Sequence, residues 1–222
     1  SPVSSDFNDA VQEGIDIKAL LMPTIKNDWL ISANDLMSSN AQVNWLVKRW
    51  IPRNSMVMLH GPSGSGKSLV VMDMVCRVAS TIDDWNGHKV RHGSVIYLAG
   101  EGYMGMKARL RAWCESNEVE PKDMNLYISK SGCDLNTVTG LQLVRDSILA
   151  IDPEPAVIVI DTLHRFMLGD ENSAQDAGEM IKACDALRNQ FGCTILYVHH
   201  TGVAENAQMR ARGSSAWKGA MD

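Results

Sequence analysis

A glycine-rich segment between an apolar run and a helical pattern has the residue types needed to hold phosphate. It reads Gly61-Pro62-Ser63-Gly64-Ser65-Gly66-Lys67-Ser68, which matches the phosphate-loop pattern GxxxxGK[ST] in full. Glycines let backbone N–H groups wrap around phosphate oxygens, and the following helix N-terminus adds its positive dipole end. Lys67 supplies a charge at the β and γ phosphates, and Ser68 a hydroxyl for Mg²⁺. The segment predicts binding of ATP with Mg²⁺.

Two carboxylates follow apolar runs of strand length. Asp161 ends the run 157–160, and an aspartate in this position holds Mg²⁺, directly or through water, in phosphoryl-transfer enzymes. Glu101 lies between Gly100 and Gly102 after the run 95–99, where it could orient and deprotonate an attacking water. Taken alone, Asp161 could be a cap and Glu101 a solvated loop residue, but their shared position at strand ends favours a metal ligand and a general base.

A further apolar run, residues 194–198, ends in two histidines, His199 and His200. A histidine at a strand tip can donate a hydrogen bond to a γ-phosphate and report hydrolysis to the next loop. A structural histidine or a metal ligand is the alternative. Adjacent strand residues point to opposite faces, so we do not expect the two rings to bind one ion.

A sheet must bring these strand ends together. Short runs bounded by Gly, Pro, Asp or Ser predict strands at Met56–His60, Val95–Ala99, Leu126–Ser129, Val157–Ile160 and Thr194–His199. Several are apolar throughout, which is typical of strands covered on both faces. Helical patterns follow Lys67 and occupy about 104–115 and 174–191; the first is apolar around most of its circumference, Leu69 and Val70 included, which predicts burial against the sheet. The alternation predicts an α/β fold with a mostly parallel sheet, helices on both faces and ligands at the carboxyl ends of the strands.

Composition limits the remaining options. Hydrophobic residues make up 45% of the 222 residues, which suits a globular core. The net charge is −5, so a nucleic-acid contact must be local or made by an assembly. No apolar run reaches the roughly 20 residues that span a bilayer, which predicts no membrane partner. Five cysteines without metal-ligand spacing indicate reduced thiols in a cytoplasm. We expect an N-terminal arm or linker over 1–44 and one ATPase domain over 45–222.

The motif order GPSGSGKS, YLAGE, VIVIDTLHRF, LYVHHTG and RGSS resembles the RepA-type hexameric replicative helicases, RecA-fold ATPases of plasmids and phages. The resemblance covers about residues 45–222, and DTLxRF and HH…RGSS are its more specific parts. It implies a RecA-like P-loop NTPase core in the bacterial cytoplasm. It further implies a homo-oligomeric ring that moves on single-stranded DNA and a fused or associated primase as a further partner.

The same resemblance assigns roles to individual residues. Lys67 and Ser68 bind triphosphate and magnesium, Glu101 is the general base, and Asp161 is the Walker B aspartate. His200, rather than His199, aligns with the γ-phosphate sensor. Residues 202–213 correspond to the mobile loop that faces the ring channel. This loop has no apolar period and carries Arg210 and Arg212, which could contact DNA phosphates when repeated around a ring; an ordinary surface loop is the alternative.

Two features depart from the family pattern. The family's arginine finger lies a few residues after RGSS, but residues 215–222 contain no arginine. Lys218 or Arg212 could act on a neighbouring subunit instead. A RecA-like sheet also continues with further strands, so we expect the ATPase domain to extend past Asp222.

Two other functions remain open. A small-molecule P-loop kinase would need an arginine-rich lid, and the nearest candidates are Lys107, Arg109 and Arg111, which also fit a solvated helix face. An ATP-dependent DNA-binding regulator or recombination ATPase of the same fold is the second. A GTPase is disfavoured because no NKxD motif occurs and Asp161 does not begin a DxxG.

Overall fold

The computed structural model describes residues 30–39, 42–100, 103–151, 154–201 and 213–221. The chain divides after Gln42 into two units. In the first, helix α3 (Ala33–Ser38) begins after Ser32, whose hydroxyl oxygen accepts a hydrogen bond from the Asp35 N–H at 3.0 Å. None of its residues is buried. The predicted site residues that the structure describes lie in the second unit, which begins at Val43.

A five-stranded parallel sheet forms the centre of the second unit, in the order β3-β9-β8-β6-β7. The strands are β3 (Met56–Gly61), β6 (Ser94–Ala99), β7 (Leu126–Ile128), β8 (Pro155–Asp161) and β9 (Thr194–His200). The predicted α/β class is confirmed, and the predicted strand ends agree with the observed ones to within two residues.

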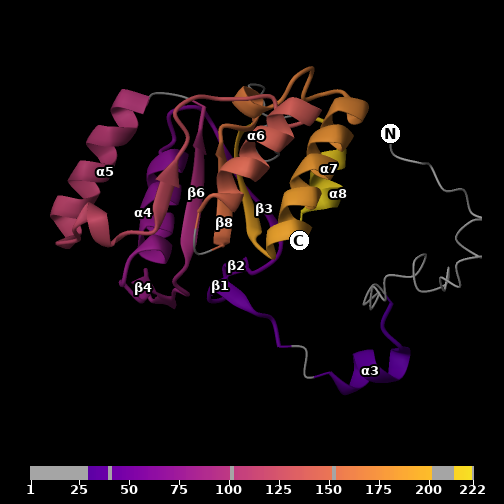
Figure 1. Cartoon of the computed structure of the whole chain (residues 1–222), viewed down its shortest axis with the longest axis horizontal. Helices are drawn as coiled ribbons and strands as arrows, with labels where there is room; N and C mark the ends of the chain where they lie inside the picture. The colour runs from indigo at the N-terminus through magenta and orange to yellow at the C-terminus, as the bar shows by residue number, and fades with distance from the viewer. Residues whose placement is uncertain (1–29, 40–41, 101–102, 152–153, 202–212, 222) are drawn as a thin grey trace, which may run out of the picture. The chain divides into compact units, whose positions relative to one another are not determined.

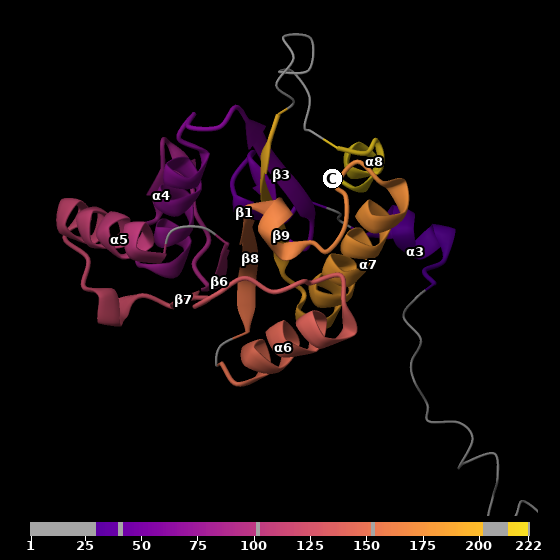
Figure 2. The same ribbon diagram turned by 90° about the horizontal axis from the view of Figure 1, so that it is seen from above.

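Helices cover both faces of this sheet (Figures 1 and 2). On one face lie α4 (Lys67–Ala79) and α5 (Tyr103–Asn117), and on the other α6 (Val138–Leu149), α7 (Ala174–Phe191) and α8 (Ala216–Ala220). Alternate residues of β8 enter different cores. Val157 and Val159 pack on the side of α4 and α5, and Ile158 and Ile160 pack on the side of α6 and α7. This two-sided burial explains why the strand sequences are apolar throughout.

The prediction that the α4 pattern is buried around most of its circumference is wrong for its first turn. Leu69 and Val70 are 56% and 46% exposed. They share the helix side of Asp73 and Arg77, which is turned away from the core formed by Val71, Val75 and Val78. The helix is therefore amphipathic, with apolar residues on part of its solvent side.

Asp73 joins α4 to two neighbouring elements. Its carboxylate accepts hydrogen bonds from the indole N–H groups of Trp85 (2.9 Å) and Trp113 (2.8 Å) and from Arg77 Nε (3.0 Å). Both indoles are buried. One carboxylate thus satisfies three donors and holds α4, α5 and β4 (Asp84–Trp85) together.

Short elements complete the second unit. Antiparallel pairs form between β1 (Trp45–Val47) and β2 (Ile51–Pro52) and between β4 and β5 (His88–Lys89). Figure 1 places them at the end where the sheet strands begin. Two 3₁₀ turns, η1 (Pro121–Asp123) and η2 (Leu163–Phe166), follow α5 and β8. Among the described residues, no helix is both long and apolar enough to cross a bilayer.

Candidate active site

The strand register brings the predicted site residues to one edge of the sheet. Gly61 at the end of β3 is opposite His200 at the end of β9, and Asp161 at the end of β8 is opposite Ala99 at the end of β6. The phosphate loop, Asp161 and His200 therefore follow three adjacent strands. Glu101, Arg210 and Arg212 lie outside the described residues, so their predicted roles remain predictions.

The backbone of the glycine-rich segment 61–68 has a shape that requires glycine. Gly64 and Gly66 have φ angles of +75° and +86°, which side chains disfavour. An added Cβ at either position would meet nothing within 4 Å, so conformation rather than space selects glycine. Gly66 is the N-cap of α4, and no side chain caps this helix start. The first N–H groups of a helix point beyond its N-terminus, so those of α4 point toward the phosphate loop, as an anion site at a helix N-terminus requires.

The Lys67 ammonium group lies inside this loop. Its Nζ donates to the carbonyl oxygens of Gly61 (2.9 Å) and Pro62 (2.7 Å) and lies 3.4 Å from His200 Nδ1. Burial lowers the pKa of Lys67, and attraction to Asp161 opposes that change. A cation held by neutral carbonyls gains electrostatic energy when phosphate oxygens replace them, so the residues present fit a bound triphosphate.

Asp161 is held by a residue that the sequence analysis did not select. The Tyr97 hydroxyl on β6 donates to Asp161 Oδ2 at 2.5 Å, and both side chains are buried. Burial and the Asp161 carboxylate raise the pKa of Tyr97, so its hydroxyl stays protonated and acts as the donor. A signal was present in the sequence, because a buried tyrosine in an apolar strand needs a partner for its hydroxyl.

Magnesium fits the donor atoms at this edge. The Ser68 hydroxyl and the Asp161 carboxylate are oxygen ligands, the kind that Mg²⁺ prefers. Ser68 is half-buried at the start of α4. Tyr97 donates to Oδ2 of Asp161, so Oδ1 is the oxygen that can face a metal ion. The chemistry of the donors therefore agrees with the predicted metal ligands.

The two histidines at the end of β9 have different surroundings, as strand alternation predicts. His199 is 1% exposed, and its Nε2 lies 4.0 Å from Glu171 Oε2. His200 is only partly buried and faces Lys67. Of the two histidines, His200 is the one that lies beside the lysine of the phosphate loop.

Backbone hydrogen bonds hold the chain on either side of the segment 202–212. The Thr201 N–H donates to Gly61 O at 3.1 Å, and the Ser214 N–H donates to Glu171 O at 3.0 Å. Trp217 also donates to Glu171 O, at 3.3 Å, and packs edge-on against Tyr197. Lys218 is exposed on α8, and the structure brings it to no other predicted site residue in the described part of the chain.

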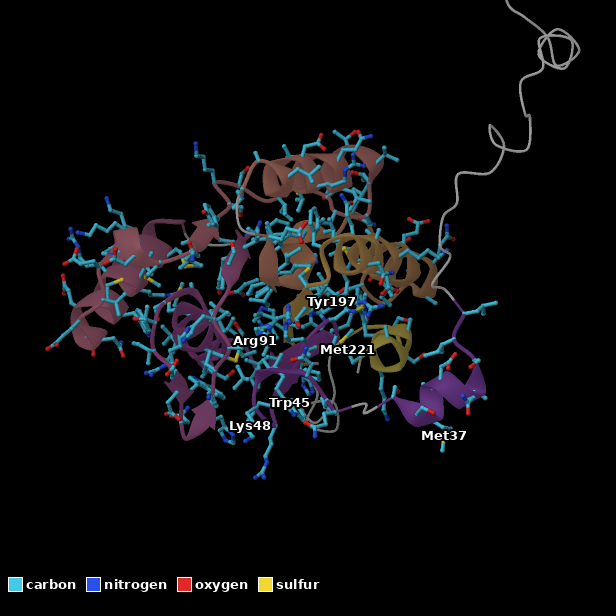
Figure 3. All side chains as sticks on the ribbon, turned by 60° about the horizontal axis from the view of Figure 1, so that its bottom comes forward. Met37, Trp45, Lys48, Arg91, Tyr197 and Met221 are labelled. Atoms are coloured by element: carbon cyan, nitrogen blue, oxygen red, sulfur yellow. The ribbon has the colours of Figure 1, made fainter. Side chains whose placement is uncertain are left out.

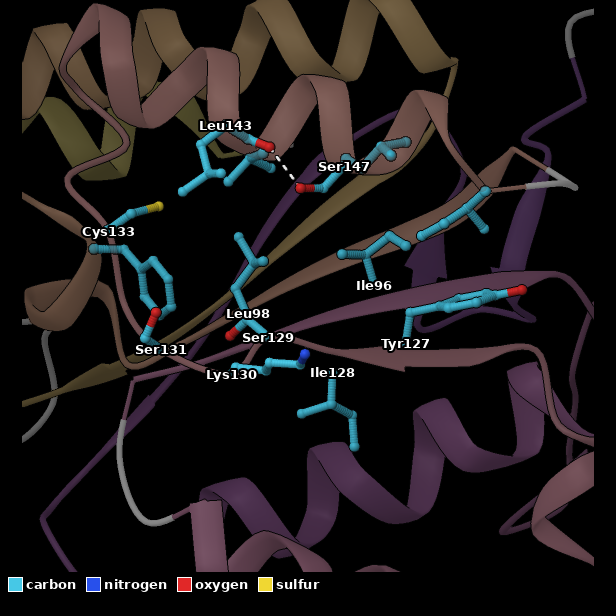
Figure 4. Close-up of a pocket in the computed structure, with 14 residues that line it drawn as sticks. Ile96, Leu98, Tyr127, Ile128, Ser129, Lys130, Ser131, Cys133, Leu143 and Ser147 are labelled. Carbon is cyan, nitrogen blue, oxygen red and sulfur yellow. Dashed lines mark hydrogen bonds between the residues drawn. The ribbon is translucent and has the colours of Figure 1, made fainter.

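The kinase alternative gains little from the structure. Lys107, Arg109 and Arg111 are exposed on α5, as a solvated helix face predicts. A cavity of about 350 Å³ lies between β6, β7 and α6, where Tyr127 and Leu143 line it (Figure 4). The cavity lining is mostly apolar, includes no residue of the phosphate loop and carries one charged side chain, Lys130. This space does not resemble a polar acceptor site beside a triphosphate.

The comparison with known protein families agrees with this geometry. The model of the AAA_25 family, described as an AAA domain, matches residues 25–206. That range includes the phosphate loop, Asp161 and His200, and it covers well over half of the chain. With a parallel sheet, a glycine loop and a strand-end aspartate at one edge, the chain belongs to the AAA_25 family of P-loop ATPase domains.

Proposed function

We propose that this chain is an ATP-hydrolysing motor module that moves on single-stranded DNA, as part of a RepA-type replicative helicase ring. The observation that carries the proposal is the position of His200. Its ring lies 3.4 Å from Lys67 Nζ, and two residues later the chain enters the segment with Arg210 and Arg212. A residue that senses the phosphate site thus connects by a short stretch of backbone to the segment proposed to contact DNA.

Each residue at the edge has a part in this reaction. Lys67 exchanges the carbonyls of Gly61 and Pro62 for phosphate oxygens and stabilises the charge that develops on the transferred phosphoryl group. Bound Mg²⁺ supplies further neutralisation of phosphate charge. Tyr97 fixes the carboxylate of Asp161, and Ser68 presents its hydroxyl. Glu101 accepts the proton of the attacking water.

Movement on DNA follows from what hydrolysis does to Lys67 and His200. When the γ-phosphate leaves, Lys67 returns to the loop carbonyls and His200 loses its phosphate contact. The change passes along Thr201 into residues 202–213, where Arg210 and Arg212 hold the DNA backbone. In a homo-oligomeric ring, each subunit contributes one such segment, and together the segments line the channel with positive charge. A bacterial primase is the further partner that we propose for this ring.

ATP hydrolysis with and without single-stranded DNA tests the proposal. We expect DNA to stimulate turnover severalfold, and Glu101→Gln to abolish turnover while ATP binding remains. Glu120→Gln, at an exposed position in front of η1, is the matched control and keeps full activity. Unstimulated turnover, or an active Glu101→Gln variant, contradicts the motor assignment.

Two further measurements separate the alternatives. A strand-displacement assay on forked DNA distinguishes a helicase from a DNA-binding regulator, which would bind DNA and hydrolyse ATP without unwinding. Consumption of ATP that requires a sugar or nucleoside instead of DNA would identify a small-molecule kinase.

A further inference from the structure

Positive charge gathers on a small antiparallel sheet at the end of the second unit where the parallel strands begin. The sheet consists of β1, β2 and the segment 89–91, and it also carries the exposed residue Trp50, next to Arg49 in the sequence. We call this group the hairpin surface; its charged members are Lys48, Arg49, Arg53, Lys89 and Arg91. It lies at the opposite end of the parallel sheet from Gly61 and Asp161, so it is not part of the candidate active site.

Backbone hydrogen bonds place three of these cations side by side. The Lys48 N–H donates to Lys89 O at 2.9 Å, and the Arg91 N–H donates to Leu46 O at 2.9 Å. Val90 between them is 3% exposed and points into the core. Because strand residues alternate, Lys89 and Arg91 point away from that core, and both are exposed. Figure 3 turns this end of the molecule forward and labels Lys48 and Arg91 on it.

Arg53 extends the hairpin surface beside Arg91. The Arg53 N–H donates to Asn44 O at 2.7 Å, and Arg91 Nη1 donates to Asn44 Oδ1 at 3.2 Å. Both arginines therefore border one asparagine. Burial and repulsion by Arg91 lower the pKa of Arg53. Two neighbouring guanidinium groups that repel each other gain stability when an anion lies between them.

The charge of the hairpin surface is not taken up in ion pairs within the described residues. None of the five cations makes an ion pair within the part of the chain that the structure describes. The nearby Asp83 pairs instead with His92 at 2.6 Å, and Asp84 Oδ1 accepts from the Gly87 N–H at 3.0 Å. Asp84 is the antiparallel register partner of Lys89 and offsets part of that lysine's charge. In a chain of net charge −5, the five cations, none of them in an ion pair among the described residues, still form a distinct basic site.

The indole of Trp50 narrows the choice of anion. It is 59% exposed, yet its Nε1 donates to His88 Nε2 at 2.8 Å and its ring packs edge-on against Trp85 at 5.4 Å. The ring is therefore fixed in position while much of its surface faces solvent. A fixed aromatic ring among cations is the arrangement on which unpaired bases stack while the cations hold the phosphates.

We propose that the hairpin surface is a second binding site for single-stranded nucleic acid, with phosphates on the cations and a base on Trp50. This site does not depend on ATP or on residues 202–213. The proposal for this site is therefore tested independently of the motor function proposed above.

Binding of a short fluorescein-labelled deoxythymidine oligonucleotide, followed by anisotropy without nucleotide, tests the site. The variant Lys48→Gln/Arg49→Gln/Lys89→Gln changes three exposed side chains that make no ion pair among the described residues, so we expect it to fold. We expect its Kd to rise about tenfold and the slope of log K against log salt to become shallower by about 2. The control Lys107→Gln/Arg109→Gln/Arg111→Gln removes equal charge from α5 and keeps the wild-type slope.

A second variant tests the stacking role of the indole. Trp50→Ala should weaken oligonucleotide binding by about fivefold or more while leaving the salt slope unchanged, because no phosphate contact is lost. Circular dichroism confirms that each variant is folded, and Lys48→Gln alone gives a smaller change of the same kind. Equal weakening by the hairpin and α5 variants overturns the proposal. An unchanged Kd for the oligonucleotide also overturns it. If the hairpin variant loses binding to phosphatidylserine vesicles but not to the oligonucleotide, the surface binds membrane and the proposal is wrong.

Discussion

The hydroxyl of Tyr97 donates to Asp161 Oδ2 at 2.5 Å, between adjacent strands of the buried sheet. This bond fixes one oxygen of the carboxylate and thereby sets the direction of the other. We expect Tyr97→Phe to raise the Mg²⁺ concentration for half-maximal ATPase activity severalfold, because the carboxylate loses its orientation. Saturating Mg²⁺ should restore most of the turnover.

Tyr197→Phe is the matched control for this prediction. Tyr197 is equally buried, on strand β9 at the other side of β8, but its hydroxyl contacts Met56 Sδ at 3.8 Å and not Asp161. Its removal should alter stability without moving the Mg²⁺ midpoint. A positioning role for Tyr97 is excluded if both variants move the midpoint equally, or if neither does.

A second prediction concerns Gly100, which follows β6. A Cβ there would collide with Arg165 Cβ and lie 2.8 Å from Arg165 Cγ and 3.2 Å from Phe166 Cε2. We expect Gly100→Ala to lower the free energy of unfolding by about 1–3 kcal/mol, since η2 must shift. Gly178 in α7 has nothing within 4 Å of an added Cβ, so Gly178→Ala should raise stability by about 0.5–1 kcal/mol. Urea unfolding of both variants measures these changes in the free energy of unfolding. If both changes had the same sign, the close contact of Gly100 with Arg165 would not explain the effect.

Asp73 gives a third prediction. Removing its carboxylate in Asp73→Ala leaves the buried indole N–H groups of Trp85 and Trp113 without their acceptor. We expect a loss of about 2–4 kcal/mol in the free energy of unfolding. Asp185→Ala removes a partly exposed partner of Arg188 and should cost less than about 1 kcal/mol. Similar losses in the two variants would show that the three-donor arrangement contributes no more than a surface ion pair.

Alkaline pH should destabilise the fold through its buried thiols. Burial raises the pKa of Cys184 and of Cys193 to about 12, from an ordinary value of about 8.5. Between those values the unfolded chain has lost both protons and the folded chain has kept them, so stability falls as pH rises, by up to about 1.4 kcal/mol per group and pH unit.

Urea unfolding at pH 8 and pH 10 checks this effect. The Cys184→Ala/Cys193→Ala variant starts less stable because its core contains cavities, but it should lose less stability between the two pH values than the wild type. Other titrating groups contribute equally to both proteins and cancel in the comparison. An equal loss in both proteins would mean that these thiols do not carry the pH dependence.

The sequence predicted the strands and the edge of the sheet where Lys67, Asp161 and His200 meet, because strand length, apolar runs and the glycine loop are local signals. It did not predict which side of α4 is exposed, since Leu69 and Val70 are apolar and only the position of the sheet decides their burial. It also did not predict the partners of Tyr97 and Asp73. The bonds from Tyr97 to Asp161 and from Trp113 to Asp73 join residues 64 and 40 positions apart, and no local pattern records such distances.

The carbonyl oxygen of Gly61 accepts both from Lys67 Nζ and from the Thr201 N–H. One main-chain atom therefore links the side chain of the phosphate-loop lysine to the backbone of the residue after β9. Changing the side chain of Thr201 does not delete the bond from position 201, because its acceptor and its donor both belong to the backbone. Proline at position 201 is the substitution that removes this donor, and the Gly61 carbonyl would then keep only its bond from Lys67 Nζ.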